Sequence, residues 1–244
     1  MTKKTTGSQI AKSGYKNEQD ICDIFNSWHK HDTAKQWLLD LNVDISNIEE
    51  LSARRIHQEK TDIQVIIKIK GFSTPFNIQV KLVTIKKGYN QIDKRWVDDY
   101  KSLWDIPEIV ATALKKFAGE IRPLVGFKTK DRRRYFLNEL SEVEQQEVLQ
   151  FFNKNKAKVL IDTLKGRGPL SASFVLVVEK SSSAYRTKFI PISKVIKILG
   201  EGGVYITPRG SLRIGRITLQ RKGGDGGAET ANMLQFKECP QDLM

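Results

Sequence analysis

Hydrophobic and polar residues alternate with two different periods along the chain, and each period predicts a different kind of element. Near the start, Ile21, Ile24, Phe25 and Trp28 recur every three or four residues, which predicts a helix over 14–31 with one apolar face. Ser46 to Glu49 and Ser141 to Glu144 have the pattern of a capping box, which marks the first turn of a helix. Helical spacing or end signals predict further helices over about 33–41, 46–49, 92–104, 107–119, 141–157 and 192–199.

Glu18 lies on the inward face of the first predicted helix, three residues before Ile21 and seven before Phe25. A carboxylate at such a position needs a partner, because burying an isolated charge is costly. Glu18 is therefore a candidate functional residue.

The period changes to two after residue 60, which predicts a β-hairpin over 61–83 with a turn at Gly71 to Pro75. One face is apolar and pairs Ile63, Val65, Ile67 and Ile69 with Phe76, Ile78, Val80 and Leu82. The opposite face carries polar side chains, namely Asp62, Gln64, Gln79 and Lys81. A slip of one residue would disrupt both faces, so the register is well specified.

The remaining pattern predicts strands near 158–164, 173–179 and 186–190, and a strand-rich, glycine-punctuated stretch over about 203–237. This order of elements favours an α/β or α+β fold, in which helices flank a mixed β-sheet. No clear linker interrupts the chain, so we expect a single compact domain over 1–244.

The charge of the chain favours a polyanionic partner. The 244 residues include 41 Lys and Arg against 28 Asp and Glu, a net charge of +13. This favours DNA, RNA or an anionic surface, although solubility alone is an alternative. Nucleic acid is the preferred partner, because the basic residues cluster at 128–134, 165–167 and 209–222.

Other features bear on the compartment. No apolar run approaches 18 residues and the N-terminus lacks the apolar segment of a signal peptide, so we expect no membrane partner. Cys22 and Cys239 form neither a disulfide framework nor a zinc pattern. We therefore expect a protein of the reducing bacterial cytoplasm.

The polar face of the hairpin suggests metal-dependent chemistry. An Asp followed by an acidic or amide residue, one spacer and a Lys is the PD-(D/E)xK nuclease pattern, here Asp62 with Gln79-Val80-Lys81. Oxygen ligands suit Mg²⁺, and the Lys lies on the same face as the residue two before it. Gln79 takes the slot of the usual acid, and Glu18 could supply the missing carboxylate. The alternative is an exposed hairpin whose polar residues face water.

Several blocks resemble one family of Type II restriction endonucleases, the HinP-one-I family. In chain order from about residue 7 to residue 237, the similar blocks are GSQIAKSGYKNEQDI, TDIQV, NIQVKLV, GYNQIDKRW, TKDRRR, LKGRG and PRGSLRIGRITLQRKGGDGGAETANMLQFK. The resemblance implies a restriction-endonuclease-like PD-(D/E)xK core and Mg²⁺-dependent cleavage of double-stranded DNA at GCGC. It implies a metal site of Asp62, Gln79, Val80 and Glu18, with Lys81 assisting the nucleophile.

The resemblance also implies residues that contact DNA. Gln91 would insert into the base stack, flanked by Asn90, Asp93 and Lys94. In the C-terminal segment the candidates are Arg209, Arg221, Lys222 and Asp225. Arg and Lys suit guanine and Asp suits cytosine, and the division between base and phosphate contacts stays open.

Two other functions remain alternatives at this point. One is a basic DNA-binding protein without catalysis, on a degenerate nuclease scaffold, since Gln79 brings no negative charge. The other is a structure-specific or repair nuclease that ignores sequence. A restriction enzyme would have a DNA methyltransferase as its functional partner, and a palindrome could be cut by a monomer or by a weak homodimer.

Overall fold

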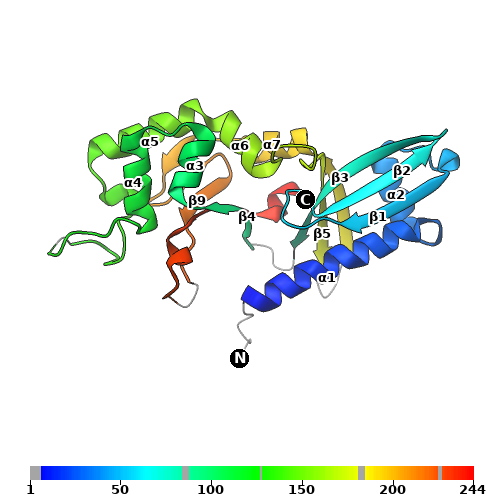
Figure 1. The fold of residues 1–244 in the computed structure, drawn as a ribbon, viewed down its shortest axis with the longest axis horizontal. Helices are drawn as coiled ribbons and strands as arrows, with labels where there is room; N and C mark the ends of the chain where they lie inside the picture. The colour runs from blue at the N-terminus through cyan, green and yellow to red at the C-terminus, as the bar shows by residue number, and fades with distance from the viewer. Residues whose placement is uncertain (1–6, 84–87, 127, 181–184, 225–226) are drawn as a thin grey trace. The chain divides into compact units, whose positions relative to one another are not determined.

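The computed structural model describes residues 7–83, 88–126, 128–180, 185–224 and 227–244, with only the backbone for 7–13. The chain divides into two compact units (Figure 1). Unit 1 comprises Met1–Gly88, Lys165–Val195 and Leu243–Met244, and unit 2 comprises Tyr89–Leu164 and Ile196–Asp242. The single compact domain over 1–244 stays a prediction.

Unit 1 is built on a five-stranded sheet with the order β1-β2-β3-β5-β6. Its helices are α1 (Gly7–Asn26), α2 (Asp32–Asp40) and the short 3-10 helices η1 (Trp28–Lys30) and η2 (Ile45–Asn47). Its strands are β1 (Glu50–Arg55), β2 (Ile63–Ile69), β3 (Phe72–Val83), β5 (Phe174–Lys180) and β6 (Tyr185–Pro191). Only the β3–β5 pair is parallel, so the sheet is mixed, as predicted.

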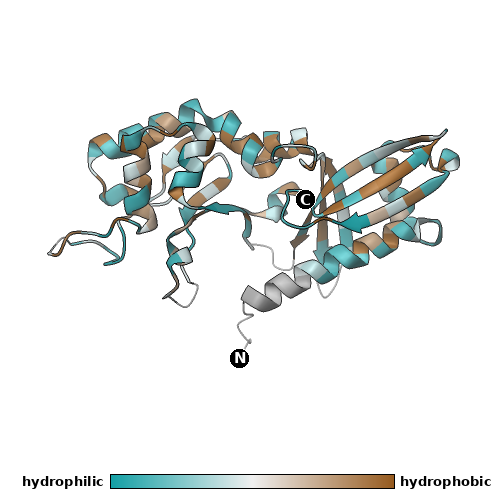
Figure 2. Ribbon diagram, viewed as in Figure 1, coloured by the Kyte–Doolittle hydropathy of each residue, from teal (hydrophilic) through white to brown (hydrophobic). Residues whose placement is uncertain are grey.

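The predicted apolar residues of the hairpin lie on the same face of the sheet, as expected. Ile63 lies opposite Ile78 and Val65 opposite Phe76. Val80 and Leu82 extend beyond β2 and instead lie beside Leu176 and Val178 of β5. The apolar face packs with Ile21 and Phe25 of α1 into one buried core, and Figure 2 shows the apolar stretch of β2 beside the more polar edge strand β1.

The polar face of the same sheet is also buried. Gln79 is 4% exposed and Lys81 is 8% exposed, and Gln64 and Asn77 are equally inaccessible. The water-facing hairpin considered from the sequence is therefore wrong. Polar groups buried in this way require partners, so this face is organised by hydrogen bonds and charge.

Unit 2 contains a second five-stranded sheet, with the order β4-β10-β9-β8-β7, where the sequence led us to expect one sheet. Its strands are β4 (Asn90–Arg95), β7 (Val204–Ile206), β8 (Leu212–Ile214), β9 (Ile217–Arg221) and β10 (Leu234–Glu238). Its helices are α3 (Val97–Trp104), α4 (Glu108–Ala118), α5 (Glu142–Lys154), α6 (Lys156–Leu164) and the C-terminal part of α7 (Ile192–Gly200). Short 3-10 helices are η3 (Leu137–Glu139), η5 (Glu229–Asn232) and η6 (Pro240–Leu243). The α/β class is confirmed, with helices flanking both sheets.

Aromatic residues form much of the core of unit 2. Tyr100 stacks on Trp104 with 4.8 Å between ring centroids, and both meet the edge of Phe236. The hydroxyl of Tyr100 donates to Asp93 Oδ1 at 2.7 Å. This bond ties β4 to α3 inside the core.

Three predicted elements differ from the structure. Residues 158–164, predicted as a strand, belong to helix α6, because the buried residues Val159, Leu160, Thr163 and Leu164 have helical spacing. The predicted helix over 92–104 is strand β4 followed by α3. The predicted helix at 46–49 is the 3-10 turn η2, capped by Asp44 rather than Ser46.

Strand β1 has no counterpart among the predicted elements. Its sequence ELSARR is mostly polar because the strand lies at an edge of the sheet. The capping box at Ser141 is confirmed, with Ser141 Oγ accepting from the Glu144 N–H.

The apolar core of unit 1 gives a stability prediction. Phe25 is fully buried, with its ring 5.1 Å from Trp37. Phe25→Ala should lower the free energy of unfolding by about 3–5 kcal/mol, because it leaves a cavity in a packed core. Tyr15→Ala, on the exposed side of the same helix, is the control. Equal urea-unfolding midpoints for the two variants would contradict the assignment of this core.

Candidate active site

Asp62 lies directly before β2 and is bonded to the backbone of β3. Its N–H donates to the carbonyl of Ile78 at 3.0 Å, and its Oδ2 accepts from the N–H of Val80 at 2.7 Å. The pairing of β2 with β3 ends at Ile63 and Ile78, and Asp62 lies one residue before this pair. The bond from the Val80 N–H therefore places the Asp62 carboxylate against the Gln79–Lys81 segment of β3.

The charges at Asp62 show which other predicted residues lie close. Burial raises the pKa of the Asp62 carboxyl, and the nearby Lys81 ammonium is the largest opposing influence. Burial, and then the Asp62 charge, raises the pKa of Glu18 to about 7, while Arg55 opposes this rise. The structure therefore gathers Glu18, Asp62 and Lys81 in one cluster.

The donors of this cluster fit a divalent metal ion. The Glu18 and Asp62 carboxylates lie close enough for the Asp62 charge to raise the pKa of Glu18, and Gln79 precedes the Val80 N–H that binds Asp62. Hard cations such as Mg²⁺ prefer oxygen ligands of this kind. Among the described residues, no group of three His, Cys, Asp or Glu side chains is arranged to hold a metal.

Sequence analysis missed a buried chain of hydrogen bonds beside the cluster. Arg54 donates to Gln64 Oε1 at 2.8 Å, and Gln64 donates to Asn77 Oδ1 at 3.0 Å. Asn77 in turn donates to the carbonyls of Pro169 and Ser171 at 2.9 and 3.1 Å. The sequence does contain a sign of these hydrogen bonds. Gln64 and Asn77 are a second pair of polar residues on the same face as Asp62 and Gln79.

The candidate DNA-contacting residues all lie in unit 2 or outside the described residues. Strand pairing places the C-terminal ends of β4 and β9, with Lys94 and Arg221, at one end of the sheet. Lys222 joins them, because the charge of Lys94 contributes to the lowered pKa of the Lys222 ammonium. Arg209 lies in the turn that leads into β8, at the same end.

Asn90 and Gln91 lie at the other end of β4, opposite Glu238 and Lys237. Gln91 is exposed and Asn90 is half-buried. Asp225 lies outside the described residues.

Two of these candidates also have structural partners. Asp93 is buried and accepts hydrogen bonds from Tyr100 and Arg95. Arg221 donates to the Ala118 carbonyl at 2.8 Å and to Asn232 Oδ1 at 2.7 Å. Both residues therefore stabilise unit 2, and their contact with DNA stays a prediction.

The comparisons with known proteins identify the family. The family model for the R.HinP1I restriction endonuclease matches residues 41–244. The chain belongs to this family. It is a Type II site-specific deoxyribonuclease, and enzymes of this kind generally use a divalent metal ion. A search of curated proteins found no match.

A solved structure supports the fold of this family member. The chain is similar to the restriction endonuclease MspI, crystallised in complex with its cognate DNA, with a TM-score of 0.67 and 15% sequence identity. The match covers 97% of this chain and 93% of MspI. At this identity the similarity establishes a restriction endonuclease fold.

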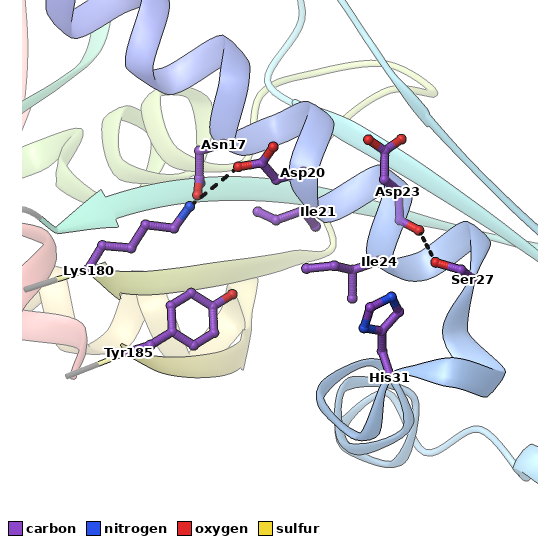
Figure 3. A pocket seen from close by; sticks show the side chains of 9 residues that line it. All are labelled: Asn17, Asp20, Ile21, Asp23, Ile24, Ser27, His31, Lys180 and Tyr185. Carbon is purple, nitrogen blue, oxygen red and sulfur yellow. Dashed lines mark hydrogen bonds and ion pairs between the residues drawn. The ribbon is translucent and has the colours of Figure 1, made fainter.

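A separate pocket of about 440 Å³ lies between α1 and the ends of β5 and β6 (Figure 3). Lys180 faces Asp20 across it at 3.7 Å, and Tyr185 lies beside them. Asn17 is 3% exposed here, and its amide has no hydrogen-bond partner in the described structure. Glu18, Asp62, Gln79 and Lys81, called the endonuclease cluster below, do not line this pocket, so the pocket is distinct from that cluster.

None of the helices in the described part of the chain is long and apolar enough to cross a bilayer.

The raised pKa of Glu18 predicts a pH dependence of stability in metal-free enzyme. The folded state binds an extra proton between the ordinary pKa of 4.5 and about 7, so stability falls as pH rises through this window. Urea unfolding in EDTA at several pH values should show wild type losing stability relative to Glu18→Gln between pH 4.5 and 7. A difference between the two proteins that is independent of pH would contradict this.

Proposed function

We propose that this enzyme hydrolyses phosphodiester bonds of double-stranded DNA with Mg²⁺, at a short palindrome that the sequence resemblance suggests is GCGC. The observation that carries the proposal is the Asp62 carboxylate, fixed by the Val80 N–H beside Gln79 and close to Lys81 and Glu18. This arrangement has the residue types and proximity that the PD-(D/E)xK chemistry requires.

Asp62, Gln79 and Glu18 would hold the metal through side-chain oxygens. Val80 would contribute its carbonyl oxygen, since its side chain has no donor. The metal, when bound, polarises the scissile phosphate and lowers the pKa of bound water. Asp62 is preorganised for this role, because the Val80 N–H fixes one of its oxygens.

Lys81 would act on the charge that develops during cleavage. Its side chain is on the same face as Gln79, and its ammonium interacts with Asp62 in a site that excludes most water. A fixed cation in such a site stabilises negative charge on the scissile phosphate or orients the attacking water.

Unit 2 would make most of the contacts that recognise the DNA sequence. Lys94, Arg221, Lys222 and Arg209 gather at one end of its sheet, where guanidinium and ammonium groups suit guanine or phosphate. Gln91, exposed at the other end of β4, is the proposed residue for insertion between bases.

Membership of a restriction endonuclease family argues against the two alternatives, the non-catalytic binding protein and the repair nuclease. The proposed setting is the bacterial cytoplasm, with a DNA methyltransferase as functional partner that protects host sites. The proposed oligomeric state is a monomer or a weak homodimer.

Cleavage should depend on the two residues at the centre of the cluster. Asp62→Ala and Lys81→Ala should each reduce cleavage by at least about 100-fold, the scale expected for losing one charge-stabilising group, while DNA binding survives. Lys68→Ala, which removes a lysine at the far end of β2, is the control. Wild-type cleavage rates in either site variant would refute the assignment.

The ends of the cleavage products test cofactor and specificity together. Unmethylated plasmid DNA incubated with the enzyme should yield discrete fragments with Mg²⁺ and none with EDTA. Sequencing of the fragment ends should place every cut at GCGC. Discrete cuts at another site would keep the chemistry and replace the specificity.

A further inference from the structure

The segment from Lys165 to Ala172, with the sequence KGRGPLSA, forms a closed loop before β5. The Ala172 N–H donates to the Lys165 carbonyl at 2.8 Å, which closes its base. Gly166 and Gly168 have φ angles of +79° and +77°, a left-handed conformation that glycine adopts without strain. The backbone of this basic loop therefore has a defined shape.

Residues next to the endonuclease cluster hold this loop in place. The Thr61 hydroxyl, one residue before Asp62, is fully buried and donates to the Leu170 carbonyl at 2.7 Å. Asn77, two residues before Gln79, donates to the carbonyls on either side of Leu170. Three consecutive loop carbonyls are thus bonded to Thr61, which adjoins Asp62, and to Asn77 of β3, the strand that carries Gln79 and Lys81.

The glycine at 166 also fixes the position of a lysine. A Cβ at this residue would lie 2.4 Å from Lys60 Cγ, so the aliphatic stem of Lys60 lies directly against the loop backbone. The Lys60 charge in turn lies close enough to Asp62 to oppose the rise of its pKa. Lys60 therefore links the loop to the cluster.

The loop brings further positive charge to this place. Arg167 is exposed and Lys165 is half-exposed, so together with Lys60 they place three cations around the loop backbone, which is open to solvent at Gly168. Basic side chains next to a hydrolytic site for DNA suit the phosphates that flank the scissile bond, because phosphate contacts set the position of the strand. A purely structural loop would need the pinning bonds but not the exposed cations.

We propose that Lys60 and the loop 165–168 form a phosphate-binding subsite for the DNA strand that enters the Asp62 cluster. Thr61 is its positioning residue, since its hydroxyl fixes the loop. The inference rests on the proposed function, because it takes DNA to be the substrate. It also gives the hydroxyl that precedes Asp62 a role that does not involve the metal.

The salt dependence of binding tests the subsite without any cleavage. A fluorescent double-stranded oligonucleotide containing GCGC is titrated in EDTA at several salt concentrations. Removing one phosphate-binding cation lowers the slope of log affinity against log salt concentration by about 0.9. Arg167→Ala and Lys165→Ala should each lower the slope by about this amount, and the control Lys68→Ala should leave it unchanged. Slopes equal to that of the control would overturn the proposal.

Thr61 variants test the positioning role. Thr61→Val removes the hydroxyl at constant shape and should lower both the slope and the affinity, and Thr61→Ser should restore them. If Thr61→Val fails to fold, the Ser variant and the two loop variants still decide the matter. A Val variant with wild-type slope would overturn the role of Thr61.

The outcome is separable from the proposed function. A wild-type enzyme that fails to cut DNA, with slopes reduced in the loop variants, would refute the catalytic assignment and support the subsite. Mg²⁺-dependent cutting with unchanged slopes would do the reverse. With both supported, steady-state cleavage by Arg167→Ala should show a raised KM and a smaller change in kcat.

Discussion

The register between β2 and β3 is the constraint on which the site of unit 1 depends. Ile63, Val65, Ile67 and Ile78 are almost fully buried on one face of these strands. Each such side chain contributes about 1.5–3 kcal/mol on burial, so a slip of one residue would expose much of the core. The same slip would turn Asp62 away from Gln79 and Lys81, which share a face of β3. The apolar face therefore fixes the geometry of the polar face.

The polar face imposes a second constraint, because it is buried as well. An amide or hydroxyl without a partner in such a place costs several kcal/mol, and here Thr61, Gln64 and Asn77 all have partners. The bonds of Thr61 and Asn77 end on the carbonyls of the loop before β5. The cluster is thus covered by a segment distant in sequence, held there by the need of buried polar groups for hydrogen bonds.

The sequence was sufficient for the parts of the site that depend on local periodicity. The period of two predicted the hairpin and the shared face of Asp62, Gln79 and Lys81, and the period of 3.6 put Glu18 on the inward side of α1. The sequence did not indicate which distant strands and loops lie next to each other. Nothing local indicates that β5 lies parallel to β3, or that Leu170 accepts a bond from Thr61. The short apolar run at 159–161 also suits a strand, and the helical spacing of the residues around it becomes clear only from which of them are buried.

The charges of Asp62 and Glu18 explain why an amide suits position 79. Burial and the charge of Asp62 already raise the pKa of Glu18 to about 7. A glutamate at 79, next to the Val80 N–H that binds Asp62, would add a third negative charge to a buried place. Like charges at close range disfavour ionisation, so one of the three acids would stay protonated near neutral pH. Gln79 keeps an oxygen donor at this position without that charge. An amide in the slot of the usual acid therefore avoids a further rise in the pKa of Asp62 and of Glu18.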